Sequence, residues 1–165
     1  MRRHFTATGF VVQGSRTLLH WHKRSQKWLP PGGHIEPDED PVQAILREIR
    51  EETGVEIDHD DLRMMGLVSE RAYEGEGHWL IFLFEVTRPI RHEEMKWTEF
   101  EEGLVEWKQP SEVADLDIPR TDRDVMWPLV QSHRGGFFMV HIDWSETDLT
   151  WTVHESVKAH PADGC

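Results

Sequence analysis

Residues 33–55, GHIEPDEDPVQAILREIREETGV, carry the densest chemical signal in the chain. Glu48, Glu51 and Glu52 are spaced so that on a helix their carboxylates would share one flank. Because carboxylates that close repel one another, such crowding indicates a bound cation, and ligands that are all oxygen favour a hard ion such as Mg²⁺ or Mn²⁺. The alternative is a solvated acidic face, which is the commoner role of a glutamate-rich helix.

The ends of that helix are well specified. Asp40 is suited to the N-cap, Pro41 to the first helical position, and Gln43 to the reciprocal partner in a capping box. Gly54 is suited to a left-handed residue that ends the helix. An apolar stripe runs beside the carboxylates and predicts that they border the core. The stripe consists of Val42, Ile45, Leu46 and Ile49.

The same stretch resembles the Nudix box at every defined position, which are Gly33, Glu39 and the run REIREETGV over residues 47–55. The resemblance implies an α/β (α+β) Nudix fold, in which a mixed β-sheet sandwich is flanked by helices. It also implies Mg²⁺-dependent hydrolysis of a nucleoside diphosphate linked to another moiety. The chain is therefore expected to be a hydrolase that acts on phosphoric anhydride bonds.

The resemblance also assigns roles to individual residues of the box and its turn. Glu48, Glu51 and Glu52 correspond to catalytic metal ligands, foremost Glu52. The carbonyl of Gly32, in the Pro-Pro-Gly-Gly turn before the helix, can join the metal shell. Arg47 is expected to orient the glutamates by ion pairing rather than to touch substrate.

A further carboxylate is indicated outside the helix. Glu102 precedes Gly103, and Glu106 follows shortly after. This order resembles the region of MutT-type members that supplies an extra metal ligand or general base. Glu99 and Glu101 are competitors for the same role, and a solvated loop charge is the plain alternative.

Four residues are candidates for substrate binding. Lys23 and Arg24 follow a predicted strand and could meet phosphates, or could lie in a solvated loop. Trp28 could stack on a base or simply cover the core. Tyr73 stands where dinucleoside polyphosphate hydrolases often carry a tyrosine, although core packing explains it equally well.

Two strand histidines form a separate candidate. His20 and His22 are two residues apart, so they share one face of the strand predicted over 17–23. They could form a metal pair. Half-exposed histidines on a strand are the commoner alternative.

Length and charge limit the function classes. At 165 residues, with a net charge of −13, the chain is predicted to be one domain over 1–155 that binds a small phosphorylated nucleotide rather than long nucleic acid. No apolar run reaches membrane-spanning length, no signal core is evident, and Cys165 is the single cysteine. A cytoplasmic protein with no membrane partner is therefore expected.

The remaining segments alternate between strand and helix patterns. The most apolar strand, 78–87, is expected at the buried centre of the sheet. The long polar connection 88–102 is expected to border the active site. Other strands are predicted over 4–13, 17–23, 62–73 and 104–108, and helical segments over 110–116 and 120–133.

The C-terminal residues lie beyond the resemblance. Residues 137–144 and 149–155 predict an added β-hairpin over 137–155, which could extend the sheet, cover the substrate cleft or form a homodimer contact. Residues 156–165 predict a disordered tail.

The sequence therefore favours a MutT-like nucleoside triphosphate pyrophosphohydrolase that releases nucleoside monophosphate and pyrophosphate. A dinucleoside polyphosphate, ADP-ribose or nucleotide-sugar hydrolase is the first alternative. A nucleotide-sensing Nudix domain without turnover is the alternative of another class.

Overall fold

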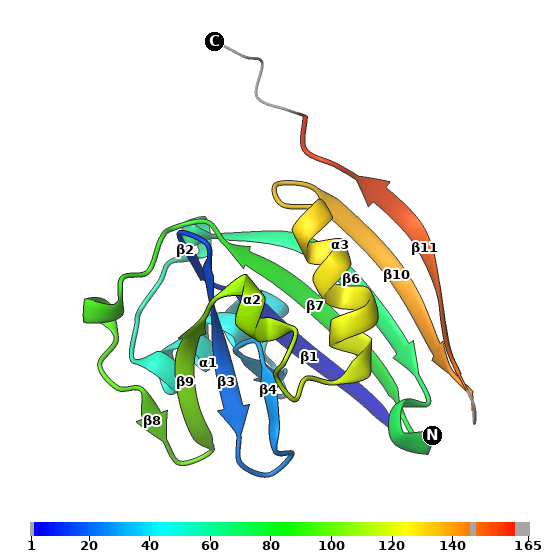
Figure 1. The fold of residues 1–165 in the computed structure, drawn as a ribbon, viewed down its shortest axis with the longest axis horizontal. Coiled ribbons are helices and arrows are strands. Elements are labelled where there is room, and N and C mark those ends of the chain that lie inside the picture. Colours follow the sequence, from blue (N-terminus) through cyan, green and yellow to red (C-terminus); the bar gives the residue numbers. More distant parts are fainter. Residues whose placement is uncertain (1, 146–147, 161–165) are drawn as a thin grey trace.

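The strands form two sheets (Figure 1) in a computed structural model that describes residues 2–145 and 148–160. The larger sheet has six strands, β1 (Arg3–Phe10), β5 (Gly32–His34), β6 (Leu62–Arg71), β7 (His78–Val86), β10 (Phe137–Trp144) and β11 (Leu149–Val157). The smaller sheet has five, β2 (Val12–Gln13), β3 (Arg16–His22), β4 (Lys27–Leu29), β8 (Glu99–Phe100) and β9 (Gly103–Lys108).

The larger sheet is mixed, as the resemblance implies. Its order is β11-β10-β6-β7-β1-β5, with β1 parallel to β7 and β6 parallel to β10, whereas the other pairs are antiparallel. The apolar strand β7 lies between β6 and β1, which confirms its predicted central place. The predicted α/β fold class is confirmed.

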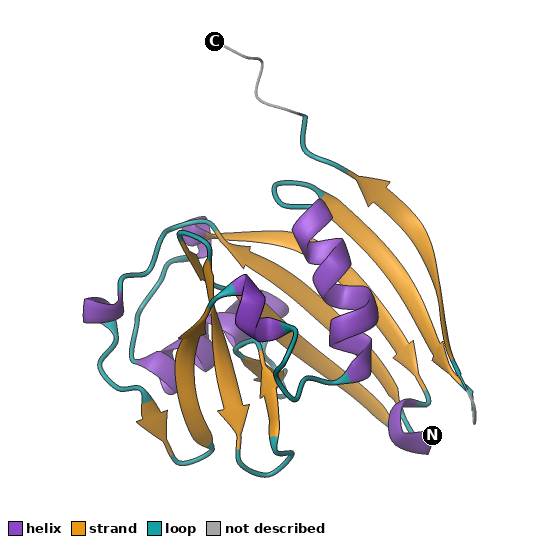
Figure 2. Ribbon diagram, viewed as in Figure 1, coloured by secondary structure: helices purple, strands orange, loops and turns teal. Residues whose placement is uncertain are grey.

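The helices cover opposite faces of the larger sheet (Figure 2). α1 (Pro41–Thr53) shares a core with β1, β7 and the smaller sheet, and α3 (Trp127–Ser132) packs on the other face against β6, β7 and β10. The shorter helical elements are α2 (Pro110–Val113), the π-helical η4 (Asp122–Met126), and the 3₁₀ turns η1 (His59–Asp61), η2 (Tyr73–Gly75) and η3 (His92–Glu94). No helix among the described residues is both long and apolar enough to cross a membrane.

The predicted ends of α1 are confirmed. Asp40 Oδ1 accepts from Gln43 N at 2.8 Å, and Gln43 Oε1 accepts from Asp40 N at 2.9 Å. Gly54 has φ 76° and donates its N–H to Arg50 O at 2.7 Å.

The buried face of α1 is rotated from the predicted one. Ala44, Ile45 and Ile49 are fully buried, whereas Val42 and Leu46 of the expected stripe are only partly buried. The helix turns this way because its carboxylate flank also faces inward, beside the strands of both sheets.

The added C-terminal hairpin extends the larger sheet. β10 pairs in parallel with β6, and β11 is the outermost strand. Of the three predicted roles, sheet extension is therefore the one that the strand pairing bears out. Ser156 and Val157, assigned to the tail from sequence, belong to β11, since they pair with Phe138 and Phe137. Residues 146–147 of the turn and 161–165 of the predicted tail lie outside the described residues.

Two other predicted boundaries were wrong for local reasons. Residues 4–13 form two strands because the chain passes between sheets at buried Val11. The strand 62–73 ends at Arg71 because Ala72 has a left-handed φ of 63°. The helix predicted over 120–133 is present over residues 120–132, with a π-helical stretch at Asp122–Met126. Pro128, just after this stretch, has no N–H for a regular α-helical bond.

Two acids lie on the α3 side of the sheet, where Glu70 is buried and Asp122 is partly buried. Glu70, on β6, accepts hydrogen bonds from the Thr121 hydroxyl and from Trp144 Nε1. Burial raises the pKa of Glu70. Burial, together with the nearby Glu70 charge, raises the pKa of Asp122 to about 7.

These acids predict how stability depends on pH. Folded Asp122 keeps its proton up to the raised pKa, whereas the unfolded chain releases it near 3.8. The free energy of unfolding should therefore fall as pH rises through about 4 to 7. Asp122→Asn should flatten this dependence and raise Tm at pH 8 by a few degrees, since ~1 kcal/mol shifts Tm by about 2–4 °C at this size. Circular-dichroism melts from pH 5 to 8 test it, and parallel curves for the two proteins would contradict it.

Candidate active site

Two of the three predicted acids are buried on the inner flank of α1. Glu52 is only 1% exposed and Glu48 is 8% exposed, whereas Glu51 lies at the surface. The predicted common flank therefore exists, but it runs from the core, at Glu52, out to solvent, at Glu51.

The two glycines of the turn let β5 lie against this flank. A Cβ on Gly33 would overlap the carboxylate of Glu48, and a Cβ on Gly32 would overlap the carbonyl of Ala7 on β1. Glycine is therefore needed at both positions, because any side chain would push β5 away from the carboxylates or from the sheet.

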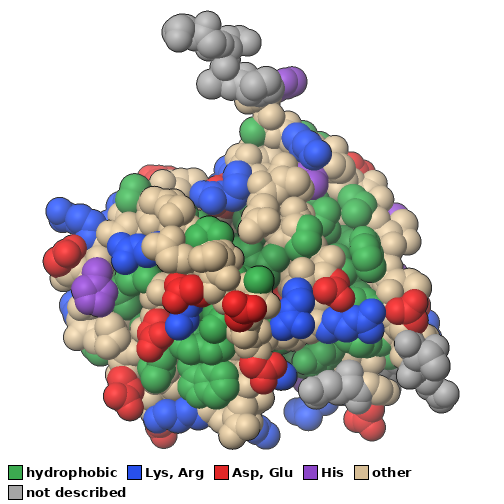
Figure 3. Space-filling model, in the orientation of Figure 1, with side chains coloured by type: hydrophobic (Ala, Val, Ile, Leu, Met, Phe, Trp, Pro, Cys, Tyr) green, Lys and Arg blue, Asp and Glu red, His purple; other side chains and the backbone are tan. Residues whose placement is uncertain are grey.

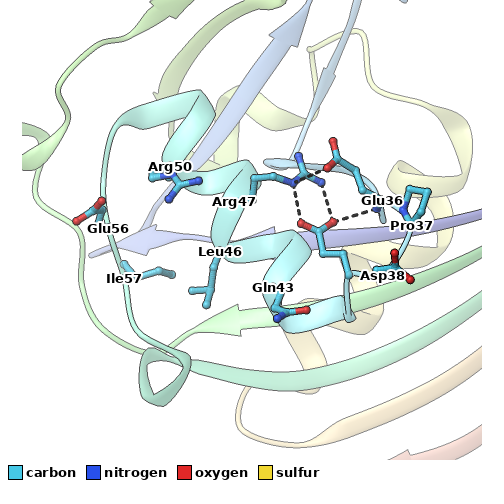
Figure 4. A pocket seen from close by; sticks show the side chains of 10 residues that line it. Glu36, Pro37, Asp38, Gln43, Leu46, Arg47, Arg50, Glu56 and Ile57 are labelled. Atoms are coloured by element: carbon cyan, nitrogen blue, oxygen red, sulfur yellow. Dashed lines mark hydrogen bonds and ion pairs between the residues drawn. The ribbon is translucent and has the colours of Figure 1, made fainter.

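Arg47 connects the acids and the turn, and Figure 4 shows its ion pairs with Glu36 and Glu39 of the loop before α1. Its guanidinium donates to both oxygens of Glu39, at 2.8 and 3.0 Å, and to Glu48 Oε1 at 2.9 Å. It also reaches Glu51 Oε2 at 3.3 Å and the carbonyl of His34 at 3.0 Å. The Arg47 hydrogen bond lowers the pKa of Glu39. This geometry suits the orienting role that the resemblance implies for Arg47.

Glu52 faces β3 rather than Arg47. His20 Nδ1 lies 3.3 Å from Glu52 Oε1. Neither oxygen of Glu52 has a well-formed hydrogen bond from any residue that the structure describes. Burial raises the pKa of Glu52, while His20 and the backbone of Gly32 act in the opposite direction.

The electrostatics of this flank fit a divalent cation. Burial and the Glu52 charge raise the pKa of Glu48 to about 7, against the opposing effect of Arg47. Two buried carboxylates, one with both oxygens unsatisfied, are unfavourable without a positive charge between them. Their all-oxygen donor set is the one that Mg²⁺ or Mn²⁺ prefers.

The β8–β9 turn brings Glu102 to the same region. The Glu102 carbonyl accepts from Lys23 N at 2.9 Å, which joins this turn to the β3–β4 turn. The charge of Glu102 also acts on Glu52 and on His22. Lys23 and the neighbouring Arg24 are exposed at this edge, where their side chains are free to meet phosphates.

The connection 88–102 borders the site through its second half. Lys96 N donates to Thr53 O at 2.9 Å, and Trp97 Nε1 donates to Glu51 O at 3.0 Å. Phe100, at its end, lies against the His20 ring. This half of the connection therefore lies beside the candidate site, as the sequence predicts.

The two aromatic candidates do not join the acids. Trp28 pairs with Trp21 across β3 and β4, so it lies on the face opposite His20. Tyr73, on η2, makes an edge contact with Trp144 at 5.8 Å, on the α3 side of the sheet. Neither residue therefore contacts the carboxylates, and their packing agrees with the plainer alternative given for both.

A surface hollow lies apart from the buried carboxylates. It lies on the outer flank of α1 and is shown in Figure 4. It is open, and its acids come from the loop before α1 and from Glu56 beyond the helix, which disfavours a phosphate ligand. Its lining residues are Glu36, Pro37, Asp38, Glu39, Gln43, Leu46, Arg47, Arg50, Glu56 and Ile57.

The burial of His20 was underestimated from the sequence. His20 is 2% exposed, not half-exposed, and its Nδ1 lies beside Glu52. The alternation of β3 could place His20 on an inner face. It could not show which residue of α1 would lie opposite.

Comparison with known proteins assigns the family. The model of the NUDIX domain matches residues 2–128, which is most of the chain. The chain belongs to the Nudix hydrolase family. The predicted family and enzyme class are therefore confirmed.

Two relatives match the chain at similar sequence identity. The uncharacterized Nudix hydrolase YvcI of Bacillus subtilis strain 168 is 27% identical over 123 residues, which cover 72% of this chain and 75% of YvcI. The asymmetrical bis(5'-nucleosyl)-tetraphosphatase of Mus musculus is 30% identical over 110 residues, which cover 60% of this chain and 70% of that protein.

Solved structures agree on the fold. The mutator MutT protein of Bacillus halodurans has a TM-score of 0.74 to this Nudix chain at 24% identity, and the match covers 92% of this chain and 97% of that one. The match covers a larger share of the chain than residues 2–128, which the domain model matches.

Proposed function

We propose that this Nudix hydrolase is a MutT-like nucleoside triphosphate pyrophosphohydrolase. The proposed reaction consumes one water and yields nucleoside monophosphate and pyrophosphate. The observation that carries the proposal is the buried pair Glu48 and Glu52 opposite the Gly32–Gly33 turn, with Arg47 holding the outer acids. The MutT-like fold over most of the chain supports it.

The pair would hold a divalent ion against the phosphoric anhydride. Such an ion, when bound, neutralises phosphate oxygens and makes a bound water more acidic. Glu48, Glu51 and Glu52 are the proposed ligands, with the Gly32 carbonyl as a further one. Arg47 keeps Glu48 and Glu51 in place through its ion pairs. Most of the rate enhancement would come from positioning and electrostatics.

A carboxylate would remove the proton from the attacking water. Glu102 suits this role because it is exposed at the edge of the site while its charge still reaches Glu52. One acid of the α1 cluster is the alternative base. Lys23 and Arg24, on the adjoining turn, would attract the phosphate chain of the substrate.

The mixed charge of the surface supports a small substrate. On the face seen in Figure 3, described Lys and Arg side chains alternate with Asp and Glu side chains, and they form no continuous basic band there. A net charge of −13 adds to this argument against long nucleic acid.

A dinucleoside polyphosphate is the second candidate substrate. The mouse relative named for that activity, 30% identical over 110 residues, favours it. Both substrates present a phosphoric anhydride, and they differ in what lies beyond the bond that is cleaved.

Product analysis separates the two candidates. Purified protein with Mg²⁺ should be assayed on nucleoside triphosphates, normal and oxidised, and on dinucleoside tetraphosphates, ADP-ribose and nucleotide sugars. Release of nucleoside monophosphate with pyrophosphate supports the proposal, whereas a triphosphate and a monophosphate from a dinucleotide support the second candidate. Chelation should stop either reaction. No turnover of any triphosphate would refute the proposal.

A further inference from the structure

His20, on β3, is the polar neighbour of the most deeply buried acid of the site. Its Nδ1 lies 3.3 Å from Glu52 Oε1, and the two side chains are 3% and 1% exposed. That distance is within hydrogen-bond range, although the present alignment falls short of a bond. With its hydrogen on Nδ1, the ring needs only a small rotation to donate to Glu52.

The surrounding residues restrict the His20 ring. The Phe100 ring lies against it with centroids 4.8 Å apart. On its other edge, Nε2 faces Gly103, where even a Cβ atom would come within 2.7 Å of the nitrogen. Gly103 is the first residue of β9, and β9 pairs with β3 along its length. The ring is therefore directed at Glu52 by both sheet pairing and packing.

Two plainer roles account less well for this arrangement. A core filler needs no nitrogen, and burying an imidazole whose Nε2 has no partner among the described residues is unfavourable compared with an apolar side chain. A direct metal ligand needs a ring nitrogen turned toward the ion. Here one nitrogen faces the carboxylate and the other faces Gly103.

We propose that His20 is a positioning residue for Glu52. The Nδ1 edge of His20 holds one carboxylate oxygen of Glu52 and so keeps that carboxylate in its orientation beside Gly32. This inference rests on the proposed function, because it takes Glu52 as a metal ligand. A donor behind a ligating carboxylate fixes its direction, and loss of such a donor typically weakens metal binding about 10–100-fold.

Two substitutions at position 20 test the proposal. His20→Leu keeps an apolar filler without a donor, whereas His20→Asn keeps an N–H donor on a shorter side chain. Binding of Mn²⁺ alone is measured from the electron paramagnetic resonance signal of the free ion, and kcat and KM are measured at saturating Mg²⁺. His20→Leu should weaken Mn²⁺ binding by about 10-fold or more and lower kcat with little change in KM. His20→Asn should restore much of the Mn²⁺ affinity and much of kcat.

Matched controls separate positioning from packing. His141→Leu removes another strand histidine, one that bonds Ser69 on β6, and it should leave Mn²⁺ binding unchanged. Equal losses in His20→Leu and His20→Asn would overturn the proposal, as would wild-type Mn²⁺ binding in His20→Leu. If His20→Leu does not fold, wild-type-like Mn²⁺ binding in His20→Ala would overturn it instead.

Glu52→Gln distinguishes this inference from the proposed function. If Glu52→Gln loses Mn²⁺ binding while His20→Leu retains it, only the role of His20 is refuted. If Glu52→Gln itself binds Mn²⁺ and turns over normally, the metal site is refuted and the role of His20 falls with it.

Discussion

Replacing Glu52 by glutamine is expected to abolish hydrolysis while leaving the fold intact. The amide keeps the size of the side chain but removes the charge that would hold a divalent ion in the core of the site. Loss of several kcal/mol of transition-state stabilisation corresponds to a fall in kcat of about 10³-fold or more. Steady-state kinetics with a nucleoside triphosphate and Mg²⁺ measure it.

The same substitution should not destabilise the protein without metal. Burial raises the pKa of Glu52, so its charged form is unfavourable there, and the neutral amide removes its repulsion of Glu48. Tm in EDTA should therefore stay equal or rise, and added Mg²⁺ should raise the Tm of the wild type but not that of Glu52→Gln. Glu56→Gln, an exposed acid just beyond α1, is the matched control. Near-normal turnover by Glu52→Gln would defeat the assignment of this residue.

The parts of the site that follow local rules could be predicted from the sequence. Asp40, Gln43 and Gly54 mark the ends of α1 because capping depends on residues three or four positions apart. The spacing of Glu48 and Glu52 places both on one flank for the same reason. The two glycines of the turn predicted that the backbone approaches a ligand or metal closely. At Gly33 the close neighbour is the Glu48 carboxylate, which a Cβ atom would overlap.

The parts that depend on packing between distant segments could not be predicted. His20 meets Glu52 because β3 passes under α1, and the contact crosses 32 positions of sequence. Trp28 was a reasonable candidate from composition, yet its pairing with Trp21 turns it to the opposite face. Tyr73 follows Ala72, whose left-handed backbone ends the strand and directs the tyrosine toward Trp144. Strand register decides the place of Trp28, and a single sequence contains little information on register or on which distant segments pack together.

Replacing Arg47 by alanine should damage both stability and activity. The side chain is only 16% exposed, and it pairs with Glu39 and Glu48, which are similarly shielded. Removing one partner of a buried ion pair leaves the other charges uncompensated and typically costs about 3–5 kcal/mol. We expect the low end of that range, about 3 kcal/mol, since the site retains some solvent, and hence a Tm lower by roughly 6–12 °C.

Activity should fall with stability because Arg47 also ties the turn to the helix. Its bond to the His34 carbonyl holds β5, and thus Gly33, against Glu48. Arg47→Ala should therefore lower kcat by about 10²-fold at a temperature where it is folded. The kcat of Arg47→Lys should lie between those of the wild type and Arg47→Ala, because one ammonium cannot reach all the acceptors that the guanidinium reaches.

Arg50, exposed on the same helix, provides the control for both measurements. Arg50→Ala should change the free energy of unfolding by less than about 0.5 kcal/mol and leave kcat near that of the wild type. If Arg47→Ala loses stability but keeps kcat, Arg47 supports the fold without orienting the acids. If it matches Arg50→Ala in both, its ion pairs contribute nothing measurable, and the acids must be oriented by the Gly32–Gly33 turn and by His20 alone.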